Sequence, residues 1–300
     1  MAIVGSGALS FTAIQNEFGG SHPISLSEYY RNGGAVPSNN TNVATSGAIN
    51  VGSFYNAVNE IGHTVSSGAS SYNVQTSAFS SYWTTAVPKR LTINAGVTLG
   101  ILTVPASMAG TLIIDHAGAI QGLGGSANGG AGATAISILS TGVTINLASG
   151  SSISGGGGGG GQGGTGGGGQ YTHTFCAGSG NSSCPRTGGC GEEDDEYTCT
   201  HHTNGGSGGA GGQGQGYNQS LTNGSGGSGG GQNAGTGGTG GNGSSFGNAG
   251  NTGSTGSNGN RTNGASGSSG GAAGRAVTFS GVSAYTIIGT NSGTIHGAYT

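Results

Sequence analysis

The sequence predicts a mainly β protein with little α-helix that carries a glycine-rich bundle of polyglycine II helices. Apolar and polar residues alternate in short runs between residues 63 and 154, as they do in strands. The window 155–274 holds 48 of the 74 glycines, and its one Ile, Leu, Val or Met is Leu221. Strand-like phrases resume after it. We therefore expect four parts: an N-terminal module at 1–62, a β-rich stem at 63–154, a glycine tip at 155–274, and C-terminal strands at 275–300 that return to the stem.

The charge content excludes several classes of function. Charged residues make up 5% of the chain, and the formal net charge is -3. Six Lys and Arg residues cannot build the basic face that nucleic-acid binding requires. No run approaches the roughly 18 consecutive apolar residues of a membrane span, and the N-terminus lacks the features of a secretory signal. We expect a soluble protein made in a cytosol, with no nucleic-acid partner and no insertion into a membrane.

The N-terminal module contains two related phrases, HPISLSEYYRNGG (22–34) and SGAINVGSFYNAV (46–58). Each has an Ile, an apolar residue two positions later, and then an aromatic pair. We expect a short strand followed by a short helix or turn, packed in a small local core. So few apolar residues make a marginal core, which favours a partner chain. The apolar and aromatic residues of the two phrases are Ile24, Leu26, Tyr29, Tyr30, Ile49, Val51, Phe54 and Tyr55.

The stem is predicted to form a sheet, barrel or β-helical coil of short strands. The phrase GGAGATAISI (129–138) resembles GGAAGRAVTF (270–279), on the far side of the glycine window. A second phrase occurs three times, as GAIQG (118–122), SSISG (151–155) and GTIHG (293–297). These matches predict that equivalent strands flank the window. The apolar positions of the alternating runs are Leu91, Ile93, Val97, Leu99, Leu112, Ile114, Ile136, Ile138, Val143, Ile145 and Leu147.

The glycine window has a period of three residues, as in Gly247, Gly250, Gly253, Gly256 and Gly259. A polyproline II geometry has three residues per turn and no internal hydrogen bonds, so such helices can pack side by side and bond to one another. We expect edge helices with one glycine face turned inward, and a central helix at 155–169, where 13 of 15 residues are glycine. Disorder is the main alternative. A collagen helix would need an unbroken triplet and abundant proline.

One insert, residues 170–206, interrupts the glycines with chemically varied side chains. It holds all four cysteines within 24 residues, which permits three disulfide pairings. A nested pairing, Cys176 with Cys199 and Cys184 with Cys190, would brace a loop that has no core. Zinc binding and free thiols are the alternatives, although the spacing lacks a C-x-x-C motif.

The insert is interpreted as a recognition loop, because aromatic rings stack on sugars and carboxylates bind hydroxyls or cations. The alternative is a solvated acidic loop without a ligand. No catalytic carboxylate pair or phosphate loop is present, so we expect no enzyme, no cofactor and no metal. The candidate receptor-binding residues are Tyr171, His173, Phe175, Glu192, Glu193, Asp194, Asp195, Glu196, Tyr197, His201 and His202, with Tyr217 and Phe246 in two milder candidate loops.

The order of alternating strands, a Gly-x-Ile-x-Gly phrase, a glycine run, polar loops, triplets and a closing GTIHG resembles the glycine-rich receptor-recognition adhesins at the tips of T-even-like bacteriophage long tail fibres. The resemblance covers roughly residues 90–300. It implies a polyglycine II sandwich whose variable loops determine host specificity. The N-terminal phrases are similar to those of many phage tail-fibre and baseplate proteins, although the tip adhesins lack such a module. This similarity implies that residues 1–62, with the apolar and aromatic residues of the two phrases, serve attachment to the virion.

The resemblance implies a virion component, made in the host cytoplasm, that attaches a tail fibre or baseplate to a bacterial surface polysaccharide or outer-membrane protein. Other phage tail or baseplate proteins would be its partners, and a homotrimer is the preferred assembly. Two other functions remain open. One is an ice-binding polyglycine II protein, and the other is a structural fibre protein that binds no receptor.

Overall fold

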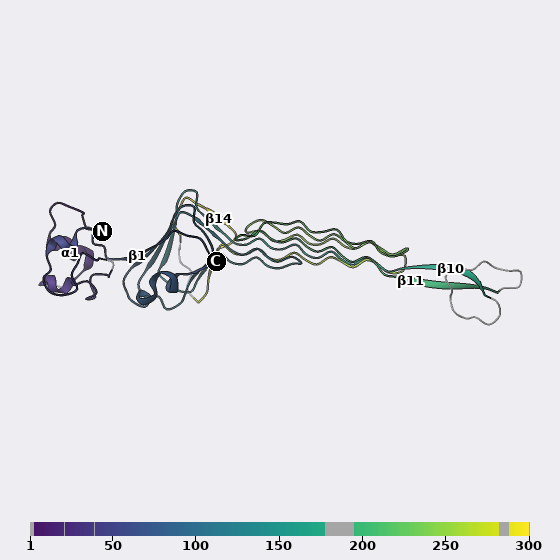
Figure 1. Cartoon of the computed structure of the whole chain (residues 1–300), viewed down its shortest axis with the longest axis horizontal. Helices are drawn as coiled ribbons and strands as arrows, with labels where there is room; N and C mark the ends of the chain where they lie inside the picture. The colour runs from purple at the N-terminus through teal and green to yellow at the C-terminus, as the bar shows by residue number, and fades with distance from the viewer. Residues whose placement is uncertain (1–2, 21, 39, 178–194, 282–287, 300) are drawn as a thin grey trace.

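The computed structural model describes residues 3–20, 22–38, 40–177, 195–281 and 288–299. The chain is elongated, and its parts follow one another along the long axis (Figure 1). An N-terminal module, here called the head, lies at one end. A β-rich stem, a bundle of glycine-rich runs and a two-stranded hairpin follow in that order. The hairpin and the head therefore lie at opposite ends of the molecule.

The head is built from three short helical elements: α1 (Phe11–Phe18), η1 (Leu26–Tyr29) and η2 (Val51–Phe54). The strands predicted at the two Ile-x-Leu/Val phrases are wrong, because η1 and η2 begin there instead. Ser25 and Asn50 are the N-caps of these turns, and each side chain accepts a backbone N–H. Such local hydrogen bonds compete with the backbone pairing of a strand.

The two aromatic pairs repeat one arrangement at a spacing of 25 residues. The first ring of each pair, Tyr29 or Phe54, is fully buried. The second ring belongs to Tyr30 or Tyr55, whose hydroxyl donates to a glycine carbonyl 2.5 Å away. The small local core predicted for the head is confirmed; it consists of Ile3, Ile14, Phe18, Tyr29, Val36, Val43, Phe54 and Ala57.

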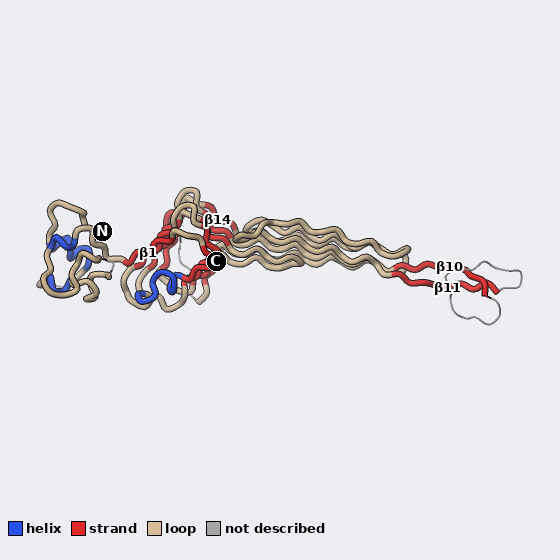
Figure 2. Tube along the Cα trace, viewed as in Figure 1, coloured by secondary structure: helices blue, strands red, loops and turns tan. Residues whose placement is uncertain are grey.

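The stem is a coil of short parallel strands in two sheets (Figure 2). Among the described residues, β1 (Ile61–Val65), β3 (Lys89–Ile93), β5 (Leu112–His116), β8 (Val143–Leu147) and β13 (Ile288–Asn291) form the first sheet in that order. The second contains β2 (Ala69–Asn73), β4 (Thr98–Val104), β6 (Ala119–Gln121), β7 (Ile136–Ile138), β9 (Ser152–Ser154), β12 (Val277–Phe279) and β14 (Thr294–His296).

The alternating pattern of the sequence corresponds to the two faces of these strands. All the apolar positions predicted from the alternation are buried, with at most 6% of each side chain exposed. A segment containing η3 (Gln75–Phe79) and η4 (Ser80–Tyr82) adds Phe79 and Trp83 to the same core. The Trp83 ring nitrogen donates to the carbonyl of Ala106 at 2.8 Å. The mainly β fold class is thus confirmed, and β1 begins at Ile61, inside the range expected for the head.

The matched phrases of the sequence lie side by side in the second sheet. Strands β6, β9 and β14 are in register, with Ile120 opposite Ile153 and Ile153 opposite Ile295. Strand β7 pairs with β12, so that Ile136 lies opposite Val277. The prediction that the glycine window lies between equivalent strands is confirmed.

The glycine bundle continues from the ends of β6 and β9 as extended runs without helix or strand assignment. Its central run, residues 155–168, donates in turn to three neighbouring segments, the first of which accepts from Gly156 and Gly159 through the carbonyls of Ala133 and Gly130. Gly157, Gly160, Gly163 and Gly166 donate to the run 204–216, and Gly158, Gly161, Gly164 and Gly167 donate to the run 248–259, over 2.8–2.9 Å. Further runs, 234–244 and 262–274, donate to carbonyls of the central run. The expected repeat of three residues is therefore present in the hydrogen bonds.

Close packing explains why these positions are glycine. A Cβ atom on Gly160 would lie 1.9 Å from the Gly241 carbonyl oxygen, and one on Gly161 would lie 1.9 Å from that of Ser268. Gly247 departs from the predicted triplet, because it has a φ of +69° and an added Cβ would meet the Gly297 backbone, although its N–H still donates to Gly155 of the central run. That conformation suits glycine, which has no Cβ penalty at positive φ.

The hairpin consists of β10 (Gly169–Ala177) and β11 (Asp195–Thr203), paired antiparallel along their length. It projects from the end of the bundle that is farther from the stem (Figure 1). None of the described helices is both long and apolar enough to span a bilayer.

Candidate functional site

The base of the hairpin is held to the bundle by asparagine side chains from two loops. Asn260 accepts the Gln170 backbone N–H through Oδ1 and donates to the Gln170 carbonyl through Nδ2, both over 2.8 Å. Asn233 donates to the same carbonyl at 3.1 Å. Sequence reasoning missed both asparagines. Their one local signal is a glycine two to four residues later, and Asn233 adopts a φ of +57°, which asparagine tolerates.

Three rings form a stack along one face of the hairpin. The rings of Tyr171 and His201, directly opposite each other in register, lie 5.0 Å apart at 19°. The rings of His201 and His173 lie 4.6 Å apart at 16°. Each of the three side chains is half-buried, and Nε2 of His201 has no hydrogen-bond partner among the described residues. This stack, here called the ring stack, brings together three of the predicted receptor-binding residues.

The opposite face of the hairpin carries two pairs of threonines. Thr172 lies opposite Thr200, and Thr174 lies opposite Thr198, and all four residues are exposed. His202 is also exposed and lies opposite Gln170. The ribbon thus presents the ring stack on one side, and four threonine hydroxyls together with the His202 imidazole on the other.

The cysteines fit the predicted nested pairing poorly. Cys199 is buried and disulfide-bonded. The strand register places it opposite His173, three residues from the position opposite Cys176. Three residues of an antiparallel strand span about 10 Å, whereas the Cα atoms of a disulfide lie within about 7 Å. The register therefore disfavours a Cys176–Cys199 bond, and the other candidates, Cys184 and Cys190, lie outside the described residues.

The acidic part of the insert is described in part only. Glu192, Glu193 and Asp194 lie outside the described residues. The backbones of Phe175, Asp195, Glu196 and Tyr197 belong to the hairpin strands, where Phe175 lies opposite Tyr197, but their side chains are outside the description. Within the described part of the chain, no three His, Cys, Asp or Glu side chains are grouped to hold a metal ion.

Tyr217 and Phe246 lie far from the ring stack, at the stem end of the bundle. The Tyr217 backbone N–H donates to the carbonyl of Gly122, directly after β6. Phe246 precedes Gly247, whose N–H donates to Gly155, directly after β9. The structure therefore does not bring these two residues together with the rest of the predicted site. Their position depends on the direction in which each glycine-rich run crosses the bundle, and the sequence of these runs does not reveal that direction.

The predicted attachment residues all lie in the head, where Tyr29 and Phe54 form its centre. Their rings meet edge to face, with centroids 6.2 Å apart. The four aliphatic members, Ile24, Leu26, Ile49 and Val51, are partly buried against this core. They pack the two capped turns against this core.

A network of paired and buried charged groups lies in the stem. Arg90 binds Glu60 through Nε at 2.9 and 3.0 Å, and Asp115 through its terminal nitrogen at 2.5 Å. These hydrogen bonds raise the pKa of Arg90. Lys89 is 1% exposed, and its ammonium group donates to the carbonyls of Thr85, Val87 and Ala109. Burial lowers the pKa of Lys89.

Comparison with known proteins gives one relevant likeness. No family model matches the chain, and no curated protein matches it. A solved structure that it resembles is the crystal structure of the gp37-gp38 adhesin tip complex of the bacteriophage S16 long tail fiber. The sequences are 18% identical over 99% of this chain and 100% of that chain, with a TM-score of 0.41. Similarity at this level does not assign the chain to that protein's family, so the functional proposal rests on its own residues.

Proposed function

We propose that this chain is a bacteriophage tail-fibre or baseplate adhesin. The head docks on another tail or baseplate protein, the stem and bundle hold the hairpin away from the virion, and the hairpin contacts a polysaccharide or outer-membrane protein of the bacterial surface. The preferred assembly is a homotrimer, because several copies add avidity to weak individual contacts.

The observation that carries this proposal is the separation of the head from the hairpin along one elongated molecule (Figure 1). Between them, the bundle uses its backbone groups to join its own runs. Such a segment has few side chains with which to bind or react, but it is well suited to hold two ends apart. This arrangement supports an attachment and presentation role.

We further infer that the bundle runs are polyglycine II helices. The donors of the central run point to different neighbours with a period of three residues, as expected for a helix of three residues per turn. Outward positions carry hydroxyl pairs such as Thr236 with Ser257 and Thr239 with Ser254, whose oxygens lie 2.9 Å apart. Fibre diffraction or solid-state NMR shifts of the glycines would test this geometry.

The ring stack is the part of the hairpin best suited to receptor contact. Aromatic faces cover the apolar faces of sugar rings, and imidazole nitrogens exchange hydrogen bonds with hydroxyls. Nε2 of His201 is itself buried and has no partner within the described residues, so receptor contact would use the exposed parts of the Tyr171, His173 and His201 rings. Mounting the stack on a paired ribbon lowers the entropy lost on binding.

The test is binding of fluorescently labelled protein to a broad panel of bacterial strains. A version in which residues 171–204 are replaced by a short glycine linker should lose binding. Tyr171→Ala and His201→Ala should weaken binding, whereas Tyr217→Ala, at the opposite end of the bundle, should not.

Binding that survives removal of the hairpin would place the receptor site elsewhere. If the intact chain binds no strain, the adhesin proposal fails. In that case, thermal hysteresis would favour an ice-binding role, and its absence would favour a structural fibre role.

A further inference from the structure

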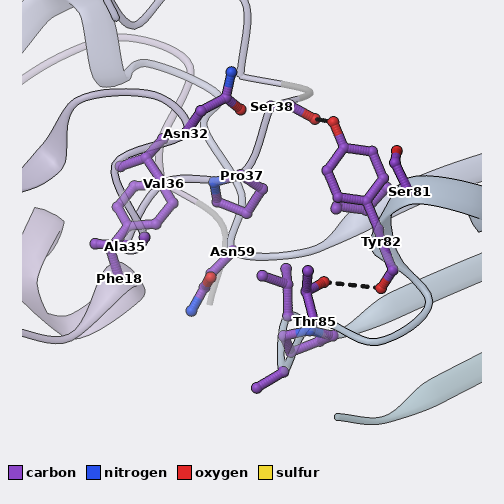
Figure 3. A pocket seen from close by; sticks show the side chains of 15 residues that line it. Phe18, Asn32, Ala35, Val36, Pro37, Ser38, Asn59, Ser81, Tyr82 and Thr85 are labelled. Carbon is purple, nitrogen blue, oxygen red and sulfur yellow. Dashed lines mark hydrogen bonds between the residues drawn. The ribbon is translucent and has the colours of Figure 1, made fainter. Parts of the chain in front are cut away.

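The head and the stem have separate hydrophobic cores. The head core ends at Ala57, and the stem core begins at Ile61. Among the described residues, one hydrogen bond joins the two parts, from the Tyr82 hydroxyl to the Ser38 hydroxyl (Figure 3). Domains joined by a small polar contact move relative to each other unless a large apolar interface holds them.

A cavity of about 580 Å³ lies between the two parts. Phe18, Val36 and Pro37 line it from the head, and Tyr82 and Thr85 line it from the stem (Figure 3). Val87 and Pro88 of the stem complete the lining. One water occupies about 30 Å³ of liquid volume, so the cavity is far larger than a packing defect. The two parts are therefore not packed together here, and rotation of the head breaks few contacts.

The segment that connects the parts is anchored on both sides of a single peptide bond. Val58 exchanges two hydrogen bonds of 2.9 Å with the buried side chain of Asn40. Asn59 bonds to Glu17 through its backbone N–H at 2.9 Å and its side chain at 3.1 Å. Glu60, in contrast, is held by Arg90 of the stem. Residues up to 59 thus belong to the head, and residues from 60 belong to the stem.

We propose that the head turns as a rigid body about the Asn59–Glu60 junction, and that the Tyr82–Ser38 hydrogen bond is the latch that holds the orientation seen here. The cavity provides the space for the turn. This joint lets the stem and bundle change direction relative to whatever the head docks on. The inference concerns the chain by itself and does not depend on receptor binding.

The test is a distance distribution between the two parts, measured by pulsed EPR. Spin labels are attached through non-canonical amino acids at the exposed positions Asn42 in the head and Thr111 in the stem, which leaves the native cysteines in place. Tyr82→Phe removes the latch but keeps the ring. We expect the population at other distances to rise about 2- to 12-fold, the range expected for losing one neutral hydrogen bond.

The matched control is Tyr30→Phe, because the Tyr30 hydroxyl bonds to Gly47 within the head. Its distribution should equal that of the wild type. If Tyr82→Phe gives the same distance distribution as the wild type, the Tyr82–Ser38 hydrogen bond is not the latch.

The pivot is tested in the Tyr82→Phe background. Glu60→Pro fixes φ at residue 60 and restricts Asn59, whereas Glu60→Ala removes the same carboxylate without fixing the backbone. The proline variant should give a narrower distribution than the alanine variant. Equal widths in two variants with wild-type circular dichroism would place the pivot elsewhere.

Discussion

Replacing Gly160 by alanine is expected to damage the centre of the bundle severely. Gly160 is buried, and an added Cβ would lie 1.9 Å from the carbonyl oxygen of Gly241 and 2.4 Å from its carbon. Ordinary contact begins at 3.4 Å, so the two runs must separate by about 1.5 Å. The neighbouring bonds from Gly241 to Gly161 and from Gly238 to Gly164, each 2.8 Å, would lengthen beyond hydrogen-bonding distance.

The loss of these two hydrogen bonds sets the expected decrease in the free energy of unfolding. Leaving a buried backbone group unpaired costs about 1–3 kcal/mol, so losing both bonds costs about 2–6 kcal/mol. That is a large share of the roughly 5–15 kcal/mol that stabilises a typical domain. The measurement is the denaturation midpoint by heat or guanidinium, followed by circular dichroism.

The matched control is Gly226→Ala, in an exposed part of an outer run. A Cβ at Gly226 meets no atom within 4 Å, and its φ is not in the left-handed region. This change should leave the midpoint unchanged or raise it slightly, because alanine restricts the unfolded chain. The gain in unfolding free energy should not exceed about 1 kcal/mol. If Gly160→Ala and Gly226→Ala give the same midpoint, close backbone packing is not the reason for the central glycines.

Three further predictions concern the stem and the hairpin base. Lys89→Met should destabilise the stem by about 1–3 kcal/mol in chemical unfolding, because three loop carbonyls lose their donor; a more stable variant would contradict this. Burial lowers the pKa of His116, and the bond to the Ser152 carbonyl opposes the shift only in part. Its neutral form therefore stabilises the fold fully above about pH 6.5, the pKa of an unfolded histidine, and this contribution is lost as pH falls toward the folded pKa. Unfolding free energies between pH 7.5 and 5 should fall less in His116→Gln than in the wild type, and equal slopes would refute the assignment. Asn260→Ala removes both bonds to Gln170 and should speed proteolysis within the hairpin without changing the midpoint of the bundle; unchanged cleavage would show that Asn260 is not the clamp.

Side-chain pattern alone was enough to predict the β stem. A period of two residues places alternate side chains on opposite faces, so runs such as 91–93 and 143–147 identify their own buried positions. Repeated phrases were equally informative, because equivalent coils of a parallel stack carry equivalent residues. Thus the likeness of 118–122 to 293–297 anticipated two strands of one sheet.

In the head, the alternation of apolar residues predicted strands where the structure has short helical turns, because N-capping side chains favour the turns. The spacing of Ile24 and Leu26 suits a strand, but the Ser25 side chain caps a turn, and Glu28 completes the capping box. Two residues of alternation are too few to outweigh such a local alternative. The repeated aromatic pairs were still a correct indication of the head core.

The sequence by itself determined the alternating strands of the stem, the positions buried in them, and that the glycine window repeats every three residues. The tertiary structure decided which of the predicted site residues lie at the same end of the bundle. It placed Tyr171, His173 and His201 in one stack, and it placed Tyr217 and Phe246 at the other end of the bundle. The physical reason is that glycine runs join through identical backbone groups, so they carry no side-chain code for their partner or direction. Only the packed bundle, closed by its loops and anchored on the strands of the stem, fixes both.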